Sequence, residues 1–284
     1  MQHVTQFSRP TDIPLLSIRY DTFGNLVPWT THLYPILGIA LYLCYPTSLR
    51  IPTDLLHKIS ILHNFLLMGF SCWTFLSLCS ILSRDSIEFE KTYYFKTIQQ
   101  PLPLFSSLTS QNFDFVIYLF YLSKYYEFFD TILLYLQGKQ PIFLQKFHHI
   151  GAVIVWHLCY VYKVDAIWLS SFVNSFVHTI MYGYYLGCLL KIKAVRRIKQ
   201  WITTMQLVQL CIPSMLAIWK YYPPAETPFN YGIIVFFVAY VAVLVYLFTH
   251  FYYMNYVSQK PSPSSLSRET SSTDLENLKT IKTE

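Results

Sequence analysis

Charged residues are scarce in this chain of 284 residues, because Asp, Glu, Lys and Arg together make up only 13% of it. Soluble domains usually carry about 25% charged residues, whereas 54% of this chain is hydrophobic and 18% is aromatic. Glycine is also rare, with eight residues, and regular turn signals are few, which argues against a many-stranded barrel. The composition therefore predicts an all-α membrane protein built from long helices.

Cysteine spacing of the kind that binds metals is absent from the chain. The six cysteines lie singly in or beside apolar runs, with no CxxC pair, so they are predicted to be small buried apolar residues. No N-x-[ST] sequon is present, so nothing indicates glycosylation. The first 14 residues, "MQHVTQFSRPTDIP", are polar and lack the apolar core of a signal peptide.

Seven apolar segments are long enough to cross a membrane, which takes roughly 20 mostly apolar residues. The first, second and last are plain lipid-compatible segments, whereas the middle four carry polar residues. The predicted organisation is a seven-helix transmembrane domain over residues 1–256, followed by a disordered cytosolic tail over residues 257–284 that is rich in Ser, Thr, Pro and charges. The seven segments are residues 29–48, 59–82, 113–136, 142–162, 166–190, 201–220 and 231–254.

The distribution of lysine and arginine predicts which way the chain crosses the membrane. With seven spans, the tail shares a side with the loops that follow the first, third and fifth spans. That side carries 13 of the 21 Lys and Arg residues, the other side carries 7, and Lys124 lies within a span. Because cytosolic loops are enriched in Lys and Arg, the C-terminus is predicted to be cytosolic and the N-terminus lumenal or extracellular. The basic run "KIKAVRRIK" (191–199) on the cytosolic side suits phosphate groups or anionic lipid heads.

The third span contains three charged residues at intervals of three. Lys124 and Glu127 share a helical face with Thr131, and Asp130 lies beside it. Each central charge costs roughly 2.5–3.5 kcal/mol on insertion scales, so the three must face the interior of the bundle and be paired. They predict either a structural ladder of ion pairs or a functional site with its support.

Two adjacent histidines, His148 and His149, lie in the apolar fourth span, one helical turn after Gln145. Neighbouring side chains on a helix point about 100° apart, so the two imidazoles are expected to have different roles. One would carry out chemistry, and the other would orient it or bind a second group.

The fifth and sixth spans each carry one polar stripe. Asn174, His178, Tyr182 and Tyr185 lie on one face of the fifth span, and Gln206 belongs to a stripe on the sixth. Taken alone, each stripe could be hydrogen-bonding contact between helices.

Depth places these polar residues in one layer. Counted from the predicted cytosolic edge at 1.5 Å per residue, Asp130 and His148 lie roughly 10 Å deep. Glu127, His178 and Gln206 fall between roughly 8 and 18 Å on the same count. Contacts between helix pairs would not require one common depth. The layer therefore predicts a polar chamber that opens to the cytosol, enclosed by helices 2–7, with an apolar tunnel behind it.

Four ordered motifs resemble those of the ELO family of fatty acid elongases. They are "KYYEFFDT" (124–131), "FHH" (147–149), "NSFVHTIMYGYY" (174–185) and "TTMQLVQ" (203–209). The resemblance covers roughly residues 25–255. The usual histidine box of the family is HxxHH, and this chain departs from it with Gln145 in the first position. "QKFHHIGA" with "IMYGYY" is most similar to fungal and algal elongases that act on polyunsaturated acyl chains.

The resemblance implies a very-long-chain 3-oxoacyl-CoA synthase in the endoplasmic reticulum membrane. Such an enzyme condenses acyl-CoA with malonyl-CoA to give a 3-ketoacyl-CoA two carbons longer, CoA and CO₂. It implies no cofactor, metal or nucleic acid. Its partners would be membrane lipids, the ketoacyl reductase, dehydratase and enoyl reductase of the elongation cycle, and a second copy of the chain in a homodimer.

The roles implied for the site residues follow from this chemistry. His148 would be the nucleophile, with His149 and His178 as catalytic partners. Asn174, Gln145 and Gln206 would hydrogen-bond imidazoles or the thioester oxygen. A third set, with a support role, comprises Lys124, Glu127, Asp130 and Tyr182.

Two other classes of protein remain as alternatives. A histidine-box di-iron desaturase or hydroxylase would need about eight clustered histidines, whereas only His148, His149, His157 and His178 lie in the polar region. A seven-helix receptor would normally open to the outside, and no internal repeat typical of transporters is visible.

Overall fold

The computed structural model describes residues 19–20, 26–45, 49, 51–84, 113–162, 164, 166–220 and 228–258. The chain divides into two compact units, Met1–Val245 and Tyr246–Glu284. Of the second unit, the structure describes the end of the last α-helix and a short π-helix, η3 (Tyr253–Val257). The predicted tail over residues 257–284 lies outside the described residues except for its first two positions.

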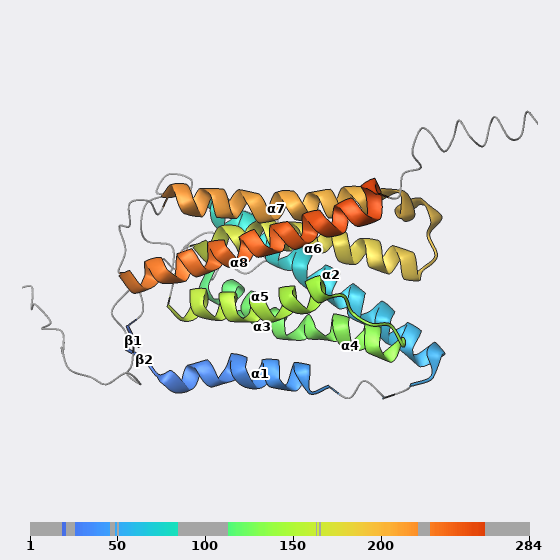
Figure 1. Ribbon diagram of the computed structural model, residues 1–284, viewed down its shortest axis with the longest axis horizontal. Coiled ribbons are helices and arrows are strands. Elements are labelled where there is room, and N and C mark those ends of the chain that lie inside the picture. The colour runs from blue at the N-terminus through green and yellow to red at the C-terminus, as the bar shows by residue number, and fades with distance from the viewer. Residues whose placement is uncertain are drawn as a thin grey trace, which may run out of the picture. The chain divides into compact units, whose positions relative to one another are not determined.

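Helices form in all seven segments that hydropathy singled out (Figure 1). The α-helices are α1 (Leu33–Leu43), α2 (Thr53–Arg84), α3 (Phe113–Tyr126), α4 (Phe128–Leu136), α5 (Phe143–Val161), α6 (Ala166–Leu189), α7 (Lys199–Lys220) and α8 (Pro228–Tyr252). Two 3₁₀ helices, η1 (Trp29–His32) and η2 (Lys193–Ile198), precede α1 and α7. The prediction of an all-α protein is therefore confirmed.

A two-residue ladder is the one departure from helical structure in the described ranges. Strand β1 (Arg19–Tyr20) pairs antiparallel with β2 (Leu26–Val27), with Arg19 opposite Val27. The ladder lies before η1, ahead of the first predicted span.

The third predicted span contains two helices instead of one. Glu127 separates α3 from α4, although its N–H still bonds the carbonyl of Ser123 at 2.9 Å. The next turn is tightened, because Asp130 N–H bonds the carbonyl of Glu127, three residues back, at 3.1 Å. Such tightened turns inside a helix often mark functional positions. This one lies where Lys124, Glu127 and Asp130 meet the other helices.

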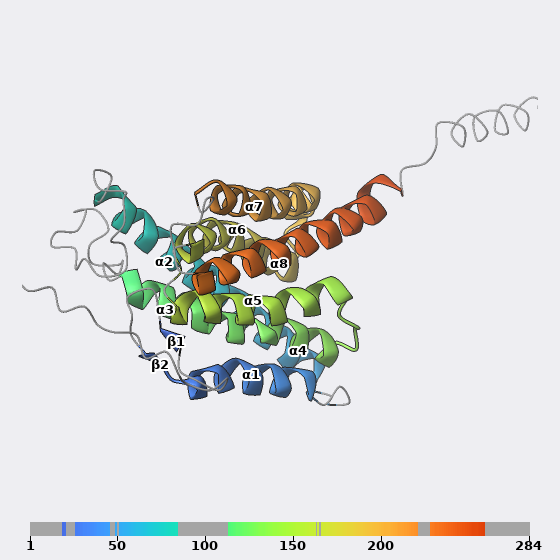
Figure 2. The same ribbon diagram turned by 60° about the vertical axis from the view of Figure 1, so that its left-hand side comes forward.

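Apolar side chains from α2, α3, α5, α6 and α8 form the main core. Val116 and Ile117 of α3, Val155 of α5 and Ile234 and Phe237 of α8 are among its fully or nearly fully buried members. On the other flank, α2 packs along α6, which packs against α7 (Figures 1 and 2). The packing brings α2, α5 and α6 around the α3–α4 break.

Large apolar side chains also cover much of the outside. Leu41 is 76% exposed, Trp201 75% and Met215 69%. Within the described ranges, two helices are long and apolar enough to cross a membrane, Thr53–Ile81 and Tyr231–Val257. Apolar side chains exposed on this scale are stable when lipid covers them.

A cavity of about 630 Å³ lies at the ends of α2, α4 and α6. Its polar lining includes Thr53, His57, Ser60 and Lys139, and its apolar lining includes Leu136. None of the site residues predicted from the sequence lines this cavity.

Candidate active site

A buried ion pair occupies the break between α3 and α4. Lys124 Nζ lies 2.7 Å from Glu127 Oε1 and donates a second hydrogen bond, 3.0 Å long, to Asn174 Oδ1 on α6. Both charged residues are only 2% exposed. Nζ also lies 4.0 Å from the ring centroid of Phe120. A carboxylate, an amide and an aromatic face thus replace water around the ammonium.

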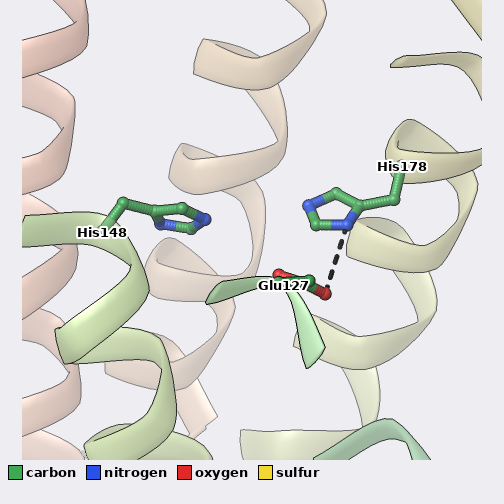
Figure 3. Close-up of side chains that lie close together, drawn as sticks. All are labelled: Glu127, His148 and His178. Carbon is green, nitrogen blue, oxygen red and sulfur yellow. Dashed lines mark ion pairs between the residues drawn. The ribbon is translucent and has the colours of Figure 1, made fainter. Parts of the chain in front are cut away.

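Two imidazoles from different helices face the carboxylate of this pair. Nδ1 of His178, on α6, lies 3.6 Å from Glu127 Oε1. His148, on α5, lies opposite, and one ligand atom from each of Glu127, His148 and His178 falls within 4.8 Å of the others. Figure 3 shows the three side chains directed toward one space, which His148 faces with the ring nitrogen farther from its backbone. Two helices and the α3–α4 break therefore bring two imidazoles and a carboxylate to one point in the interior.

These donor atoms are of the types that zinc accepts. However, Glu127 Oε1 already receives the Lys124 ammonium at 2.7 Å. A divalent cation bound there would lie beside a fixed positive charge in a buried site, which is electrostatically unfavourable. The arrangement suits imidazole chemistry better than a metal.

A second cluster surrounds the carboxylate of Asp130. His63 Nε2 lies 2.8 Å from Oδ1, and the hydroxyl of Tyr182 donates to Oδ2 at 2.8 Å. His149 Nε2 lies 3.9 Å from the same Oδ2. This carboxylate therefore links side chains from α2, α5 and α6.

The adjacent histidines of α5 take different positions. His148 faces Glu127 and His178, whereas His149 faces Asp130. Nδ1 of His149 is buried and has no hydrogen-bond partner among the residues that the structure describes. A buried polar atom of this kind is costly unless a ligand satisfies it, which makes this nitrogen a candidate substrate contact.

The three amides expected to hydrogen-bond imidazoles or the thioester oxygen each contact another protein group in the structure. Gln145 Nε2 donates to Thr131 Oγ1 at 3.2 Å, and Gln206 Nε2 contacts the sulfur of Met181 at 3.1 Å. Asn174 accepts from the buried ammonium. Gln145 therefore connects α5 to α4, at the position where the resemblance leads one to expect a histidine.

Two side chains of the site lie on helices that the sequence predicted to be plain lipid-compatible segments. His63 lies on α2, and Tyr240, on α8, donates a 2.9 Å hydrogen bond to the carbonyl oxygen of His148. Both helices are apolar enough to cross a membrane, but the prediction missed that each contributes a side chain to the site. A signal was present for His63, because an imidazole and an amide, Asn64, stand side by side in an apolar run. Tyr240 lies among many tyrosines and gives no comparable signal.

Residues 27–264 match the model of the GNS1/SUR4 (ELO) family. The chain belongs to the ELO family. It is accordingly a membrane protein, in agreement with its apolar helices.

Curated relatives of this ELO protein carry elongase names. It is 31% identical to "Fatty acid elongase A" of Dictyostelium discoideum over 237 residues, which are 78% of this chain and 81% of the relative. It is 35% identical to "Fatty acid elongase sre1" of the same organism, over 54% of this chain and 58% of the relative. It is also 35% identical to "Very long chain fatty acid elongase 4" of Trypanosoma cruzi, over 39% of each chain. The chain thus spans about half the length of the last two relatives.

Proposed function

We propose that this ELO protein is a fatty acid elongase. It condenses a long-chain acyl-CoA with malonyl-CoA, and it releases a 3-ketoacyl-CoA two carbons longer, CoA and CO₂. Polyunsaturated acyl-CoA is one candidate substrate. The elongase names of its relatives support this reaction class. The observation that carries the proposal is that the imidazoles of His148 and His178 lie close to each other and to the buried carboxylate of Glu127.

His148 is the proposed acyl carrier. Neutral imidazole is a competent nucleophile near pH 7, and a site closed to water protects an acyl-imidazole from hydrolysis. The carrier nitrogen attacks the thioester carbon, and CoA leaves. This step needs no metal or cofactor.

The malonyl half of the reaction needs donors for a developing enolate. His178 and His149 are the proposed donors, because they flank the two sides of the α3–α4 break. The buried, unpartnered Nδ1 of His149 is suited to a substrate oxygen or proton. Lys124, Glu127, Asp130 and Tyr182 would hold these rings in place.

The proposed setting is an endoplasmic reticulum membrane crossed seven times, with the C-terminus cytosolic and the N-terminus lumenal. The second to seventh predicted spans, which correspond to α2 to α8, would enclose a polar chamber for the thioester, with an apolar tunnel behind it for the acyl chain. Residues 1–256 would form this domain, and residues 257–284 a cytosolic tail. Proposed partners are membrane lipids, the other three enzymes of the elongation cycle and a second copy of the chain, but no nucleic acid.

A two-substrate assay on purified protein tests the function. Mass spectrometry should detect 3-ketoacyl-CoA only when both acyl-CoA and malonyl-CoA are present. Acyl-CoA alone should release about one CoA per enzyme. Intact-mass analysis should show one acyl group on the protein, and peptide mapping should place it within residues 143–153. His148→Gln should abolish this burst, whereas His250→Gln, at an exposed position of α8, should retain it.

The outcomes separate the two parts of the proposal. Absence of 3-ketoacyl-CoA with any long-chain acyl-CoA would contradict the function. Formation of product without a burst of CoA would contradict only the acyl carrier, and a direct attack within a ternary complex would replace it.

A further inference from the structure

Tyr240 of α8 makes two contacts with one residue of the site. Its hydroxyl donates to the carbonyl oxygen of His148 at 2.9 Å, and the same hydroxyl oxygen lies 3.4 Å from His148 Nδ1. Tyr240 is 7% exposed. Tyr240 therefore contacts both the backbone and the imidazole of His148.

Gly151 makes this approach possible. A Cβ atom at this position would lie 2.0 Å from Cε2 of Tyr240, closer than any real contact. The glycine three residues after His148 in "HHIGA" thus leaves space for the tyrosine ring against the backbone of α5. Both residues are needed for this contact, because Tyr240 supplies the hydroxyl and Gly151 leaves the space that its ring occupies.

The hydroxyl fixes which nitrogen of His148 carries the proton. A tyrosine hydroxyl has one hydrogen to donate, and this hydrogen is used on the carbonyl oxygen. Toward Nδ1 the oxygen can then only accept, which favours the tautomer with hydrogen on Nδ1. The other nitrogen, Nε2, keeps its lone pair. Nε2 is the nitrogen that Figure 3 shows facing Glu127 and His178.

We propose that Tyr240 is a positioning residue that holds His148 in the Nδ1–H tautomer and so keeps Nε2 free to attack the thioester. The inference rests on the proposed function and deepens it. In the first step Nε2 bonds to the acyl carbon, the C–S bond breaks, and CoA leaves as a thiolate. The acyl-imidazolium keeps its Nδ1 proton, which hydrogen-bonds the oxygen of Tyr240.

The second step restores the same tautomer. Malonyl-CoA loses CO₂, and the electron pair of that bond forms the new C–C bond to the acyl carbon. The C–N bond breaks, and Nε2 regains its lone pair. One proton from solvent neutralises the CoA thiolate, which balances the reaction.

The test compares Tyr240→Phe with the wild-type protein. Phenylalanine keeps the ring and its packing but removes the hydroxyl. Because one hydrogen bond is lost, the rate of the CoA burst with acyl-CoA alone should fall about five- to tenfold. Acyl-CoA affinity should be unchanged, and the melting temperature should fall by no more than a few degrees. Tyr246 is a 69% exposed tyrosine of the same helix, and the Tyr246→Phe variant should release the CoA burst at the wild-type rate.

A tautomer measurement separates positioning from packing. In ¹⁵N NMR spectra of protein labelled with ¹⁵N-histidine, the His148 signals are those that disappear in the His148→Gln variant. In the wild-type protein their chemical shifts should show that the hydrogen is on Nδ1. Tyr240→Phe should shift His148 toward a mixture of tautomers. A wild-type His148 that carries its hydrogen on Nε2 would overturn the proposal.

Kinetic outcomes complete the test. An unchanged burst rate in Tyr240→Phe would overturn the proposal while leaving the elongase function intact. A Tyr240→Phe protein in which acyl-CoA affinity and melting temperature both fall markedly, while the tautomer of His148 is unchanged, would also overturn the proposal. Tyr240 would then be a packing residue. A wild-type protein without any burst would contradict the acyl carrier itself, a different failure from that of Tyr240.

Discussion

A lysine and a glutamate in an apolar interior must compensate each other, because burying either charge alone is very costly. Lys124 and Glu127 do this at 2.7 Å, and Asn174 accepts another of the lysine's hydrogens. Nδ1 of His178 also lies 3.6 Å from this carboxylate. At the scale of single residues, the pair therefore has two tasks: it neutralises itself, and it gives the imidazole a fixed electrostatic partner.

The energetic coupling of this pair can be measured with a double-mutant cycle. Lys124→Met or Glu127→Gln alone leaves one uncompensated buried charge, and each should lower the free energy of unfolding by about 3–5 kcal/mol. The double variant should lose clearly less than the sum. Thermal and denaturant unfolding of detergent-solubilised protein, followed by circular dichroism, provides the measurement.

A matched control lies on α2. Lys58 and Asp54 form a 3.3 Å ion pair with side chains that are 73% and 87% exposed. Asp54→Asn should change the free energy of unfolding by no more than about 0.5 kcal/mol. Strictly additive effects of the two buried substitutions would show that Lys124 and Glu127 are not coupled.

The sequence predicted the residues that cluster in the candidate site where a motif or an intramembrane charge made them conspicuous. Lys124, Glu127, His148 and His178 all belong to such signals, and the structure brings them together. Tyr240 was not predictable, because its role depends on how α8 crosses α5 at a glycine. Long-range packing of this kind leaves no local pattern in the chain.

At the scale of elements, a chain of hydrogen bonds connects η1 to α3 and α5. His32 Nδ1 lies 2.9 Å from His157 Nε2, and the other nitrogen of His157 lies 2.9 Å from the hydroxyl of Tyr121. His32 also contacts the hydroxyl of Tyr162 at 3.0 Å. None of these groups belongs to the clusters around Glu127 or Asp130. These hydrogen bonds therefore anchor the start of the first span to the bundle.

Replacing the central imidazole should weaken this anchor without affecting the chemistry. His157→Phe removes the partner of His32 Nδ1 and of the Tyr121 hydroxyl, and it should lower the free energy of unfolding by about 2–4 kcal/mol. Turnover per folded molecule should stay at the wild-type level. Denaturant unfolding and 3-ketoacyl-CoA formation, each normalised to folded protein, measure the two quantities.

The paired substitution provides the control. Because His32→Phe with His157→Phe removes both members of the imidazole pair, the double variant should lose less stability than the two single losses combined. A His157→Phe protein with normal stability and reduced turnover would instead place this histidine in the reaction.

Hydropathy located the helices but not their ends or interruptions. α2 begins at Thr53, six residues before the predicted span, because its polar first turn lies outside the apolar run. The break at Glu127 was missed for a related reason, since periodicity in the sequence does not distinguish a continuous helix from one with a tightened turn. Both features are defined by local backbone hydrogen bonds, such as those from Leu56 N–H to the carbonyl of Pro52 and from Asp130 N–H to that of Glu127, which hydropathy does not report.

At the scale of the whole molecule, charge and lipid exposure together predict an orientation. Apolar side chains such as Leu41 and Trp201 cover the outside, and most of the 21 Lys and Arg residues lie outside the seven predicted spans. η2 lies within the basic run 191–199 on the predicted cytosolic side. This bias is the physical basis for a cytosolic C-terminus.

Limited proteolysis of sealed microsomes tests this orientation. With one epitope tag before residue 1 and another after residue 284, external trypsin should cut the tail at Arg268 and remove the C-terminal tag. The N-terminal tag, which precedes Arg9, should persist until detergent opens the vesicles. A lumenal marker protein that survives trypsin in the same sample shows that the vesicles are intact.

Loss of the N-terminal tag with protection of the tail would reverse the orientation. The polar layer at Glu127 and Asp130 would then face the lumen, where a substrate made in the cytosol could not reach it, so this single result bears on the proposed chemistry as well as on the topology.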